Sequence, residues 1–211
     1  MNADIVIIDY GIGNIKSICS ALSHFNINIS ISNDEDEILS AKGIILPGVG
    51  AFKSGMKNLL ELNLDLTLKK YFETNKPILG ICLGMQLLFE SSEEFGFCEG
   101  LGLIEGKVQK LKNEKKLPHI AWSEIKKTNS DNTILDGINN NSDFYFVHSF
   151  VSYPKNTSEM IASSNYYNQE FCSVVKKGNI YGCQFHPEKS GSKGLKLLEN
   201  FIRLTNKPSH R

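Results

Sequence analysis

The amino-acid sequence predicts an α/β fold, with a largely parallel central sheet flanked by helices. Up to Ile81, short apolar runs alternate with longer segments of helical periodicity, an order typical of parallel βαβ units. After Gly100 the pattern changes to short strands and turns. No Pro-rich or Ser-rich linker, repeat or low-complexity run divides the 211 residues, so we expect a single domain over residues 1–211.

The first half of the chain contains the alternating elements. Short apolar runs bounded by polar or glycine residues indicate strands, and apolar residues recurring every three to four positions indicate helices. The predicted strands are Ile5 to Ile8, Ile27 to Ile31, Gly43 to Leu46 and Ile78 to Ile81, and the predicted helices run from about Asn14 to Phe25 and from about Phe52 to Leu60. In such a sheet, ligands bind at the carboxyl ends of the strands.

The second half is predicted to be mostly strands and to end in a helix. The predicted strands are Val108 to Leu111, Phe144 to Val147, Met160 to Ala162, Ser173 to Val175 and Ile180 to Phe185. The final helix runs from about Gly191 to Leu204, and Leu195, Leu198 and Ile202 lie on its apolar face. This spacing of three and four residues indicates a helix that packs one side against the core.

The first candidate functional residue is a cysteine between a predicted strand and a helical segment. The junction reads Gly80-Ile81-Cys82-Leu83-Gly84 and is followed by the apolar segment Met85 to Phe89. Glycines two residues before and after a nucleophile permit the sharp turn of a nucleophile elbow, which exposes the side chain at the end of the strand. A helix N-terminus also favours the thiolate form of cysteine. A buried structural cysteine is the alternative that this motif alone leaves open.

A histidine and a glutamate near the end of the chain favour nucleophilic catalysis. They lie in Gln184-Phe185-His186-Pro187-Glu188, directly after a strand-like run. Proline disfavours the helical region for the residue before it, so we expect an extended segment in which His186 and Glu188 face the same side. A thiol nucleophile needs an imidazole base, and that base needs a carboxylate partner. We therefore predict a triad of Cys82, His186 and Glu188.

Composition and charge argue against several classes of function. The 23 basic and 23 acidic residues give a formal net charge of zero, so no overall field favours nucleic acid. Five cysteines, an odd number without Cys-x-x-Cys spacing, argue against a disulfide framework and a zinc site; we expect no metal and no cofactor. No apolar run is long enough to span a bilayer, and no signal peptide precedes the first predicted strand. We therefore expect no membrane partner and a cytoplasmic location.

Three motifs resemble, in their order along the chain, those of the class I, triad-type glutamine amidotransferases. They are the loop Leu46-Pro47-Gly48-Val49-Gly50, the cysteine motif Gly80 to Gln86 and the histidine motif Gln184 to Glu188. The resemblance implies the flavodoxin-like fold of that family. It also implies that the chain hydrolyses the small molecule glutamine to glutamate and ammonia through a thioester at Cys82.

The resemblance also implies roles for residues around the nucleophile. Attack on the glutamine amide builds negative charge on its oxygen, so backbone N–H donors must point at that oxygen. Leu83, directly after Cys82, and the glycine-rich loop residues Val49 and Gly50 are the expected donors. A plain strand-to-helix turn is the alternative for this loop. The residues expected to contact the substrate are Gly50, Gln86, Ser149 and Phe150.

Further stretches resemble one branch of the family, the glutaminase subunits of imidazole glycerol phosphate synthases. They are Ile8 to Asn14, Pro47 to Phe52, Pro118 to Trp122, Phe146 to Phe150 and Glu188 to Gly191. The resemblance to this branch implies a heterodimer in which ammonia passes to a (βα)8-barrel cyclase subunit that serves histidine biosynthesis. It places four residues at the partner interface, namely Asn14, His119, Trp122 and Lys189. A core position for Trp122 and a free surface position for Lys189 are the alternatives.

One motif departs from the pattern of the branch and bears on which acceptor receives the ammonia. Where the branch has Pro-His-Met-Gly-Trp-Asn, this chain reads Pro118-His119-Ile120-Ala121-Trp122-Ser123. Paralogues with a similar glutaminase feed a cyclase-like barrel that amidinates nucleotide-linked sugars for surface polysaccharide, and the departure at Ala121 and Ser123 raises that alternative. Two further functions also stay open: a non-catalytic binding module of the same fold, and a free-standing hydrolase with the same elbow.

Overall fold

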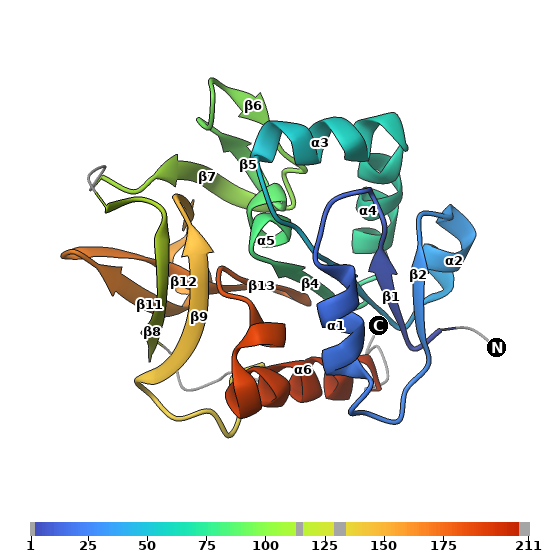
Figure 1. Cartoon of the computed structure of the whole chain (residues 1–211). Coiled ribbons are helices and arrows are strands. Elements are labelled where there is room, and N and C mark those ends of the chain that lie inside the picture. The colour runs from blue at the N-terminus through green and yellow to red at the C-terminus, as the bar shows by residue number, and fades with distance from the viewer. Residues whose placement is uncertain (1–2, 113–115, 129–133, 207–211) are drawn as a thin grey trace.

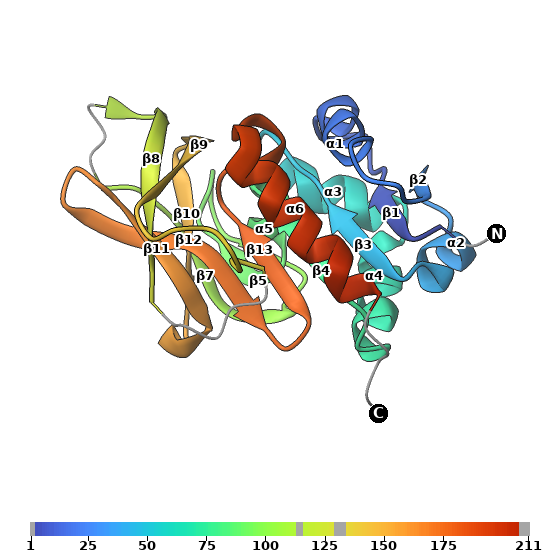
Figure 2. The ribbon, with the colours of Figure 1, turned by 90° about the horizontal axis from the view of Figure 1, so that it is seen from below.

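The computed structural model describes residues 3–112, 116–128 and 134–206, and a nine-stranded sheet runs through its middle (Figures 1 and 2). One half of the sheet is parallel. Its strands lie in the order β2 (Ile29–Ser32), β1 (Ile5–Ile8), β3 (Gly43–Leu46), β4 (Ile78–Ile81) and β13 (Ile180–Cys183). With β13 as the fifth strand, this is the flavodoxin-like order. The predicted α/β class is confirmed, with β4 and β13 side by side in its parallel half.

The other half of the sheet is antiparallel. It continues from β13 through β12 (Gln169–Lys177), β11 (Met160–Tyr166), β8 (His119–Lys127) and β9 (Ser142–His148). A smaller four-stranded sheet lies beside it in the order β10 (Phe150–Pro154), β7 (Ile104–Lys110), β5 (Phe89–Ser92) and β6 (Cys98–Glu99). Since β10 follows β9 after a single residue and contacts β12, the two sheets meet at the ends of β9 and β10.

Helices cover both faces of the parallel half (Figure 2). On one face, α1 (Ile15–Leu22) and α6 (Gly191–Thr205) share a core with Ile5, Ile7 and Ile45. On the other, α2 (Glu35–Ser40), α3 (Phe52–Glu61), α4 (Leu64–Glu73) and α5 (Leu83–Leu87) share a second core with Val6, Ile8 and Ile44. Successive strand residues thus enter opposite cores, as the pleat of a strand requires. No helix among the described residues is long and apolar enough to cross a membrane.

The predicted elements match best where local sequence decides the structure. The strands predicted at Ile5, Gly43 and Ile78 have the observed bounds, and the final helix ends one residue later than predicted, at Thr205. Elements that the sequence analysis did not predict are α2, α4, β5, β6, β8 and β10. In β8 the pattern is inverted: His119 points inward, whereas the apolar residues Ile120 and Trp122 are exposed. Alternation of apolar and polar residues could not reveal such a strand.

The turn between β4 and α5 lies directly against the loop that follows β3, with no room for side chains between them. A Cβ atom added to Gly84 would lie 1.8 Å from the carbonyl oxygen of Leu46. One added to Gly48 would lie 2.8 Å from the backbone nitrogen of Gly84, and one added to Gly80 would lie 2.7 Å from the backbone of Met85. Glycine is therefore required here because backbone approaches backbone.

Replacing Gly84 by alanine should disrupt this turn, because the new methyl group would overlap the Leu46 carbonyl oxygen. We expect Gly84→Ala to lower the free energy of unfolding by about 4 kcal/mol or more, among the largest single-substitution effects. Gly55→Ala in α3 is the matched control, since its new Cβ would meet mainly the flexible Leu87 side chain, at 3.1 Å. Its expected change is about 1 kcal/mol or less. Urea unfolding followed by circular dichroism compares them, and equal losses would contradict the steric argument.

Candidate active site

Cys82 lies at the point where β4 turns into α5, as the glycine spacing predicted. Its backbone has φ 53° and ψ −110°, a conformation that costs a non-glycine residue energy and is concentrated at functional sites. The Cys82 N–H donates to the carbonyl oxygen of Cys183 in β13 at 2.8 Å, which ties the turn to the next strand. The following helix has only five residues, so any stabilisation of a thiolate by its dipole comes from a very short helix.

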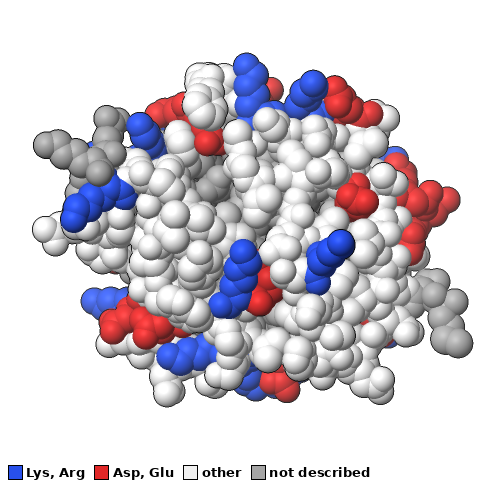
Figure 3. All heavy atoms as spheres, in the orientation of Figure 1, with Lys and Arg blue, Asp and Glu red and all other residues white. Residues whose placement is uncertain are grey.

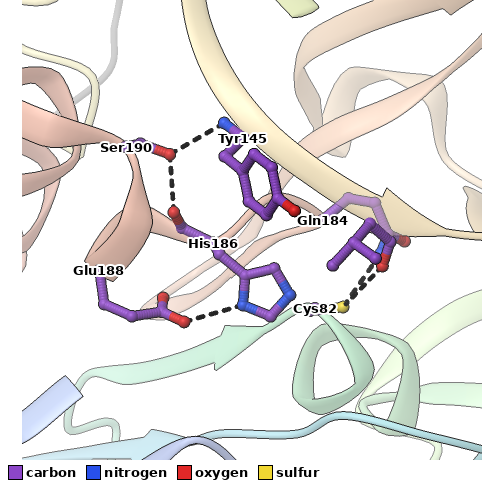
Figure 4. Close-up of polar contacts among 7 residues, drawn as sticks. Cys82, Tyr145, Gln184, His186, Glu188 and Ser190 are labelled. Atoms are coloured by element: carbon purple, nitrogen blue, oxygen red, sulfur yellow. Dashed lines mark hydrogen bonds and ion pairs between the residues drawn. The ribbon is translucent and has the colours of Figure 1, made fainter. Parts of the chain in front are cut away.

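His186 and Glu188 form a buried pair at the end of β13, but not in the way the sequence predicted. His186 is extended, with φ −99° and ψ 97°, whereas Pro187–Lys189 form the 3-10 helix η3. The expectation of an extended segment through Glu188 is therefore wrong, because the chain turns directly after His186. The turn brings the Glu188 Oε1 atom to 2.8 Å from His186 Nδ1, and the two side chains are 1% and 3% exposed (Figure 4).

Backbone contacts to β9 hold His186 in place. The His186 N–H donates to the carbonyl oxygen of Tyr145 at 2.9 Å. Ser190 Oγ donates to the His186 carbonyl oxygen at 2.6 Å and accepts from the Tyr145 N–H at 3.0 Å (Figure 4). The imidazole then lies between Glu188 and Cys82, and its buried Nε2 atom has no hydrogen-bond partner among the described residues. This nitrogen faces the cysteine sulfur.

The surroundings of His186 favour its protonated form. Burial acts to lower the pKa of the imidazole, but Cys82 and the Glu188 carboxylate outweigh it and raise that pKa to about 10. An imidazolium beside a sulfur stabilises the thiolate, the nucleophilic form of cysteine. The three residues of the predicted triad are thus adjacent, with the sulfur, the imidazole and the carboxylate in that order.

Cys82 and His186 line a cavity of about 250 Å³. Every residue that the sequence analysis assigned to the oxyanion site or the substrate site lines it, namely Val49, Gly50, Leu83, Gln86, Ser149 and Phe150. These residues come from three separate parts of the chain: the loop after β3, the helix α5, and the junction of β9 with β10. Their roles remain predictions, whereas their proximity to Cys82 and His186 is observed.

A glutamine pair forms part of the cavity wall. Gln86 Nε2 donates to the carbonyl oxygen of Phe150 at 2.9 Å and to Gln184 Oε1 at 3.0 Å. A primary amide has two N–H groups, so these bonds use both donors of Gln86 and leave its Oε1 atom as an acceptor for a ligand. Gln184 Nε2 in turn lies 3.7 Å from the Cys82 sulfur (Figure 4). The sequence motif contains Gln184, but its spacing does not predict this role.

The glycine-rich loop after β3 is tightly packed at Pro47 and Gly48, whereas Val49 and Gly50 have free space around them. The buried hydroxyl of Tyr10 donates to the carbonyl oxygen of Pro47 at 2.7 Å, and Gly48 packs against α5. In contrast, Val49 is 41% exposed, and Gly50 has φ +97° with nothing within 4 Å of an added Cβ. The peptide between Val49 and Gly50 therefore has room to reorient beside Cys82.

Glu94 is a cavity residue that the sequence analysis missed. It follows β5, and its Oε2 atom accepts from the Phe52 N–H at 2.7 Å. Burial raises the pKa of this carboxyl above its usual range, although the bond from Phe52 opposes the shift. It is the one acidic side chain among the described residues that line the cavity. No motif marks it, because it reaches the cavity only through the second sheet.

The predicted interface residues are not all at the surface. Trp122 is 56% exposed, its ring lies 6.0 Å from that of Tyr145, and the exposed Lys189 holds its Nζ atom 5.9 Å from the same Tyr145 ring. We call Trp122, Tyr145 and Lys189 the ring group. Asn14 is half-buried just before α1, which contacts η3. On the face drawn in Figure 3, charged side chains lie mostly toward the rim, and some basic and acidic side chains also stand near the middle.

His119 lies in the core of the protein and not at the surface. The prediction places it at the partner interface, but its exposed fraction is 0%. Its ring stacks between Tyr166 and Phe146, with centroid distances of 4.1 and 5.2 Å. Because β8 turns alternate residues to opposite faces, His119 points into the core while Trp122 lies outside. The structure thus gives no support to direct contact of this imidazole with a docked partner.

The cysteines and other potential metal ligands are dispersed. All five cysteines are free thiols. Within residues 3–112, 116–128 and 134–206, no group of three or more His, Cys, Asp or Glu side chains is placed to hold a metal ion.

Comparison with known sequences identifies relatives along nearly the whole chain. The family model described as glutamine amidotransferase class-I matches residues 6–204. Imidazole glycerol phosphate synthase subunit HisH 1 of Legionella pneumophila (strain Lens) is 42% identical over 212 residues, which cover 96% of this chain and 100% of that protein. Imidazole glycerol phosphate synthase subunit HisH of Bacillus cereus (strain G9842) is 45% identical over 197 residues, 93% of each chain.

Solved structures share the fold at lower sequence identity. A crystal structure of a glutamine amidotransferase superposes with a TM-score of 0.73 at 18% identity and covers 96% of this chain and 99% of its own. The structure of PurLQS from Thermotoga maritima gives a TM-score of 0.72 at 19% identity, with 96% and 99% covered. These likenesses extend over the whole architecture, the antiparallel half included.

Replacing Glu188 by glutamine tests the electrostatics of the pair without changing its shape. The amide cannot stabilise the imidazolium as a carboxylate does, so the pKa of His186 should fall from about 10 by about one unit or more. NMR titration of the histidine ring protons measures it. Glu199→Gln is the control, because that carboxylate pairs with Lys196 at the surface of α6. An unchanged His186 pKa in Glu188→Gln would show that the carboxylate does not set it.

Proposed function

The chain belongs to the class I glutamine amidotransferase family, and from this premise we propose that it is the glutaminase subunit of an imidazole glycerol phosphate synthase. Residues 1–211 then form one glutamine amidotransferase domain. The observation that carries the proposal is that Cys82 and His186 line a cavity large enough for an amino acid, with Glu188 paired to the far nitrogen of His186. The names and coverage of the two HisH relatives support the assignment to this branch.

The proposed reaction begins at the sulfur. His186 accepts the proton of the Cys82 thiol on Nε2, the nitrogen that has no other partner among the described residues. The thiolate then attacks the side-chain amide carbon of glutamine, and a carbon–sulfur bond forms as the amide π bond opens onto oxygen. Glu188 accepts a hydrogen bond from His186 Nδ1, which fixes the tautomer and stabilises the imidazolium.

Ammonia leaves in the next step. The oxyanion needs backbone donors, and we propose the N–H groups of Leu83, Val49 and Gly50, which line the cavity, for this role. The imidazolium returns its proton to the amide nitrogen as the carbon–nitrogen bond breaks, which releases ammonia and leaves a thioester on Cys82. Water, deprotonated by His186, attacks the thioester, and glutamate departs as the thiol is restored.

The cavity offers a complementary contact for each polar end of glutamine. The half-buried Glu94 carboxylate suits the α-ammonium group of the substrate, since it is the acidic side chain among the described residues at the cavity wall. The free acceptor on Gln86 suits an N–H donor, and Ser149 and Phe150 supply backbone groups along the same wall. Gly50 leaves space for the substrate beside the sulfur.

A partner is proposed because ammonia in water at neutral pH is mostly protonated and is then no nucleophile. We propose a heterodimer with a (βα)8-barrel cyclase subunit, which receives the ammonia and uses it in histidine biosynthesis. The exposed Trp122 and Lys189 beside the half-buried Tyr145 support docking at the ring group, and we include Asn14, just before α1, in the same interface because α1 contacts η3. The names of the relatives favour this acceptor over a nucleotide-linked sugar. Five free thiols are consistent with a cytoplasmic location.

The nucleophile is tested by separating glutamine hydrolysis from ammonia use. In the complex with the barrel cyclase, Cys82→Ala should abolish glutamine-driven formation of imidazole glycerol phosphate, because no thioester can form. Synthesis driven by ammonium salt at high pH should persist, since the acceptor reaction needs only ammonia. Cys98→Ala, which removes a free thiol outside the cavity, should retain both activities. Glutamine hydrolysis by Cys82→Ala would refute the assignment of the nucleophile.

Docking is tested at Lys189. The isolated chain should release glutamate slowly, and the barrel partner with its substrate should raise that rate by orders of magnitude. Lys189→Glu should weaken partner binding by about tenfold, because the reversed charge opposes a carboxylate on the partner. Lys193→Glu makes the same change on α6 outside the ring group and should bind normally. Titration calorimetry measures the affinity for the partner, and glutamate release measures the stimulation. A normal affinity of the Lys189→Glu variant would show that Lys189 is not part of the interface.

A further inference from the structure

Two buried histidines outside the triad form a continuous hydrogen-bonded chain with a serine of β8. Ser123 Oγ lies 2.9 Å from His119 Nε2. His119 Nδ1 lies 3.1 Å from His148 Nε2, and His148 Nδ1 lies 3.1 Å from the carbonyl oxygen of Phe150. The chain therefore runs from the middle of β8 to the first residue of β10, at the wall of the glutamine cavity.

The end of this chain determines every proton position in it. A carbonyl oxygen only accepts, so His148 must carry its proton on Nδ1, and its Nε2 must accept. His119 then carries its proton on Nδ1 and donates to His148, which leaves His119 Nε2 to accept from the Ser123 hydroxyl. Burial lowers the pKa of His119 to about 4 and that of His148 to about 3. Both rings are thus neutral near pH 7, as this arrangement requires.

Packing prevents either ring from turning away. His119 is stacked against Tyr166 and Phe146, and His148 meets Phe171 edge to face at 5.1 Å. The two rings are 0% and 7% exposed, so water does not compete for their nitrogens. A buried polar group that loses its partner under these conditions bears the full cost of desolvation.

The Phe150 carbonyl oxygen joins this chain to the cavity wall. It accepts from His148 Nδ1 and also from Gln86 Nε2, at 2.9 Å. Gln86 also donates a hydrogen bond to Gln184, whose amide nitrogen lies beside the Cys82 sulfur. The position of the Phe150 carbonyl therefore sets the direction of the Gln86 amide. It thereby also sets where the free Oε1 acceptor of Gln86 points.

We propose that His148 and His119, capped by the Ser123 hydroxyl, are positioning residues that hold the Phe150 carbonyl and, through it, Gln86 in the arrangement that binds glutamine. The proposal rests on the proposed function, because it concerns the same cavity. It also gives the departure at Ser123 a role: serine supplies a hydrogen-bond donor at a position where the branch motif has asparagine, whose amide can also donate. Neither histidine contacts the sulfur or exchanges protons with the substrate in this scheme.

The proton positions are tested directly by NMR, independently of any activity. In the whole chain with ¹⁵N-labelled histidine, long-range ¹H–¹⁵N spectra at pH 7 should show His119 and His148 as neutral rings protonated at Nδ1. His119→Gln and His148→Gln assign the two signals. A ring protonated at Nε2, or an imidazolium, at either position would overturn the proposal.

The positioning role is tested by kinetics in the complex with the barrel cyclase. Ser123→Ala leaves His119 Nε2 without a donor, and we expect the KM for glutamine to rise about fivefold to tenfold while kcat stays within about twofold, because the triad is untouched. Ser123→Asn should restore the KM. Ser164→Ala is the matched control, since its buried hydroxyl donates to the Glu124 carbonyl oxygen of the same strand at 2.8 Å but lies outside the chain; its KM should not change.

The outcomes separate the two proposals. No glutamine hydrolysis by the unmodified complex would refute the proposed function, whereas the NMR result would still decide the proton positions. Hydrolysis by the unmodified complex with equal KM values for Ser123→Ala and Ser164→Ala would overturn the positioning role alone. A double variant, Ser123→Ala with His148→Phe, should raise the KM no more than His148→Phe does, because both break one chain. Additive effects would contradict a single chain.

Discussion

Close contact between the β4–α5 turn and the loop after β3 is the constraint on which the rest of the site depends. With a glycine at 84, the turn approaches the Leu46 carbonyl so closely that no Cβ fits between them. That approach holds Cys82 in its positive-φ conformation at the end of the strand and places the glycine-rich loop beside the sulfur. Backbone strain and close backbone packing thus both act at Cys82, and such strain is concentrated at functional sites.

Three buried histidines near the site show that charged neighbours can outweigh burial in setting the pKa of an imidazole. Burial lowers the pKa of His119 and His148, whose ring nitrogens bond to each other, to a hydroxyl and to a carbonyl oxygen. His186 is buried as well, yet Glu188 and Cys82 raise its pKa. One neutral chain therefore ends at the cavity wall, and one charged pair lies beside the sulfur. The neutral chain can orient groups without altering the charge balance of the catalytic pair.

The antiparallel half of the sheet completes the site that the parallel half begins. β9 fixes His186 through Tyr145 and Ser190, and the β9–β10 junction supplies the cavity wall. Because the chain leaves β9 directly into the second sheet, the same segment joins the core and the cavity to the sheet whose β5–β6 hairpin carries Glu94. The parallel half alone would lack the β9 hydrogen bonds that hold His186 in place, and it would lack the cavity wall formed by the β9–β10 junction.

The sequence by itself determined the strands that flank the nucleophile and the glycine elbow, because both depend on backbone rules that act within a few residues. It also predicted the residues of the triad, from the base and the carboxylate that a thiol nucleophile needs. Tertiary structure alone decided that Pro187–Lys189 form a turn and that His119 is buried. It also decided that Glu94 reaches the cavity. These features depend on pairing between segments far apart in the chain, and burial is a property of those distant neighbours rather than of local residue pattern. In β8 the apolar side chains lie on the outer face, so periodicity alone could not say which side faces the core.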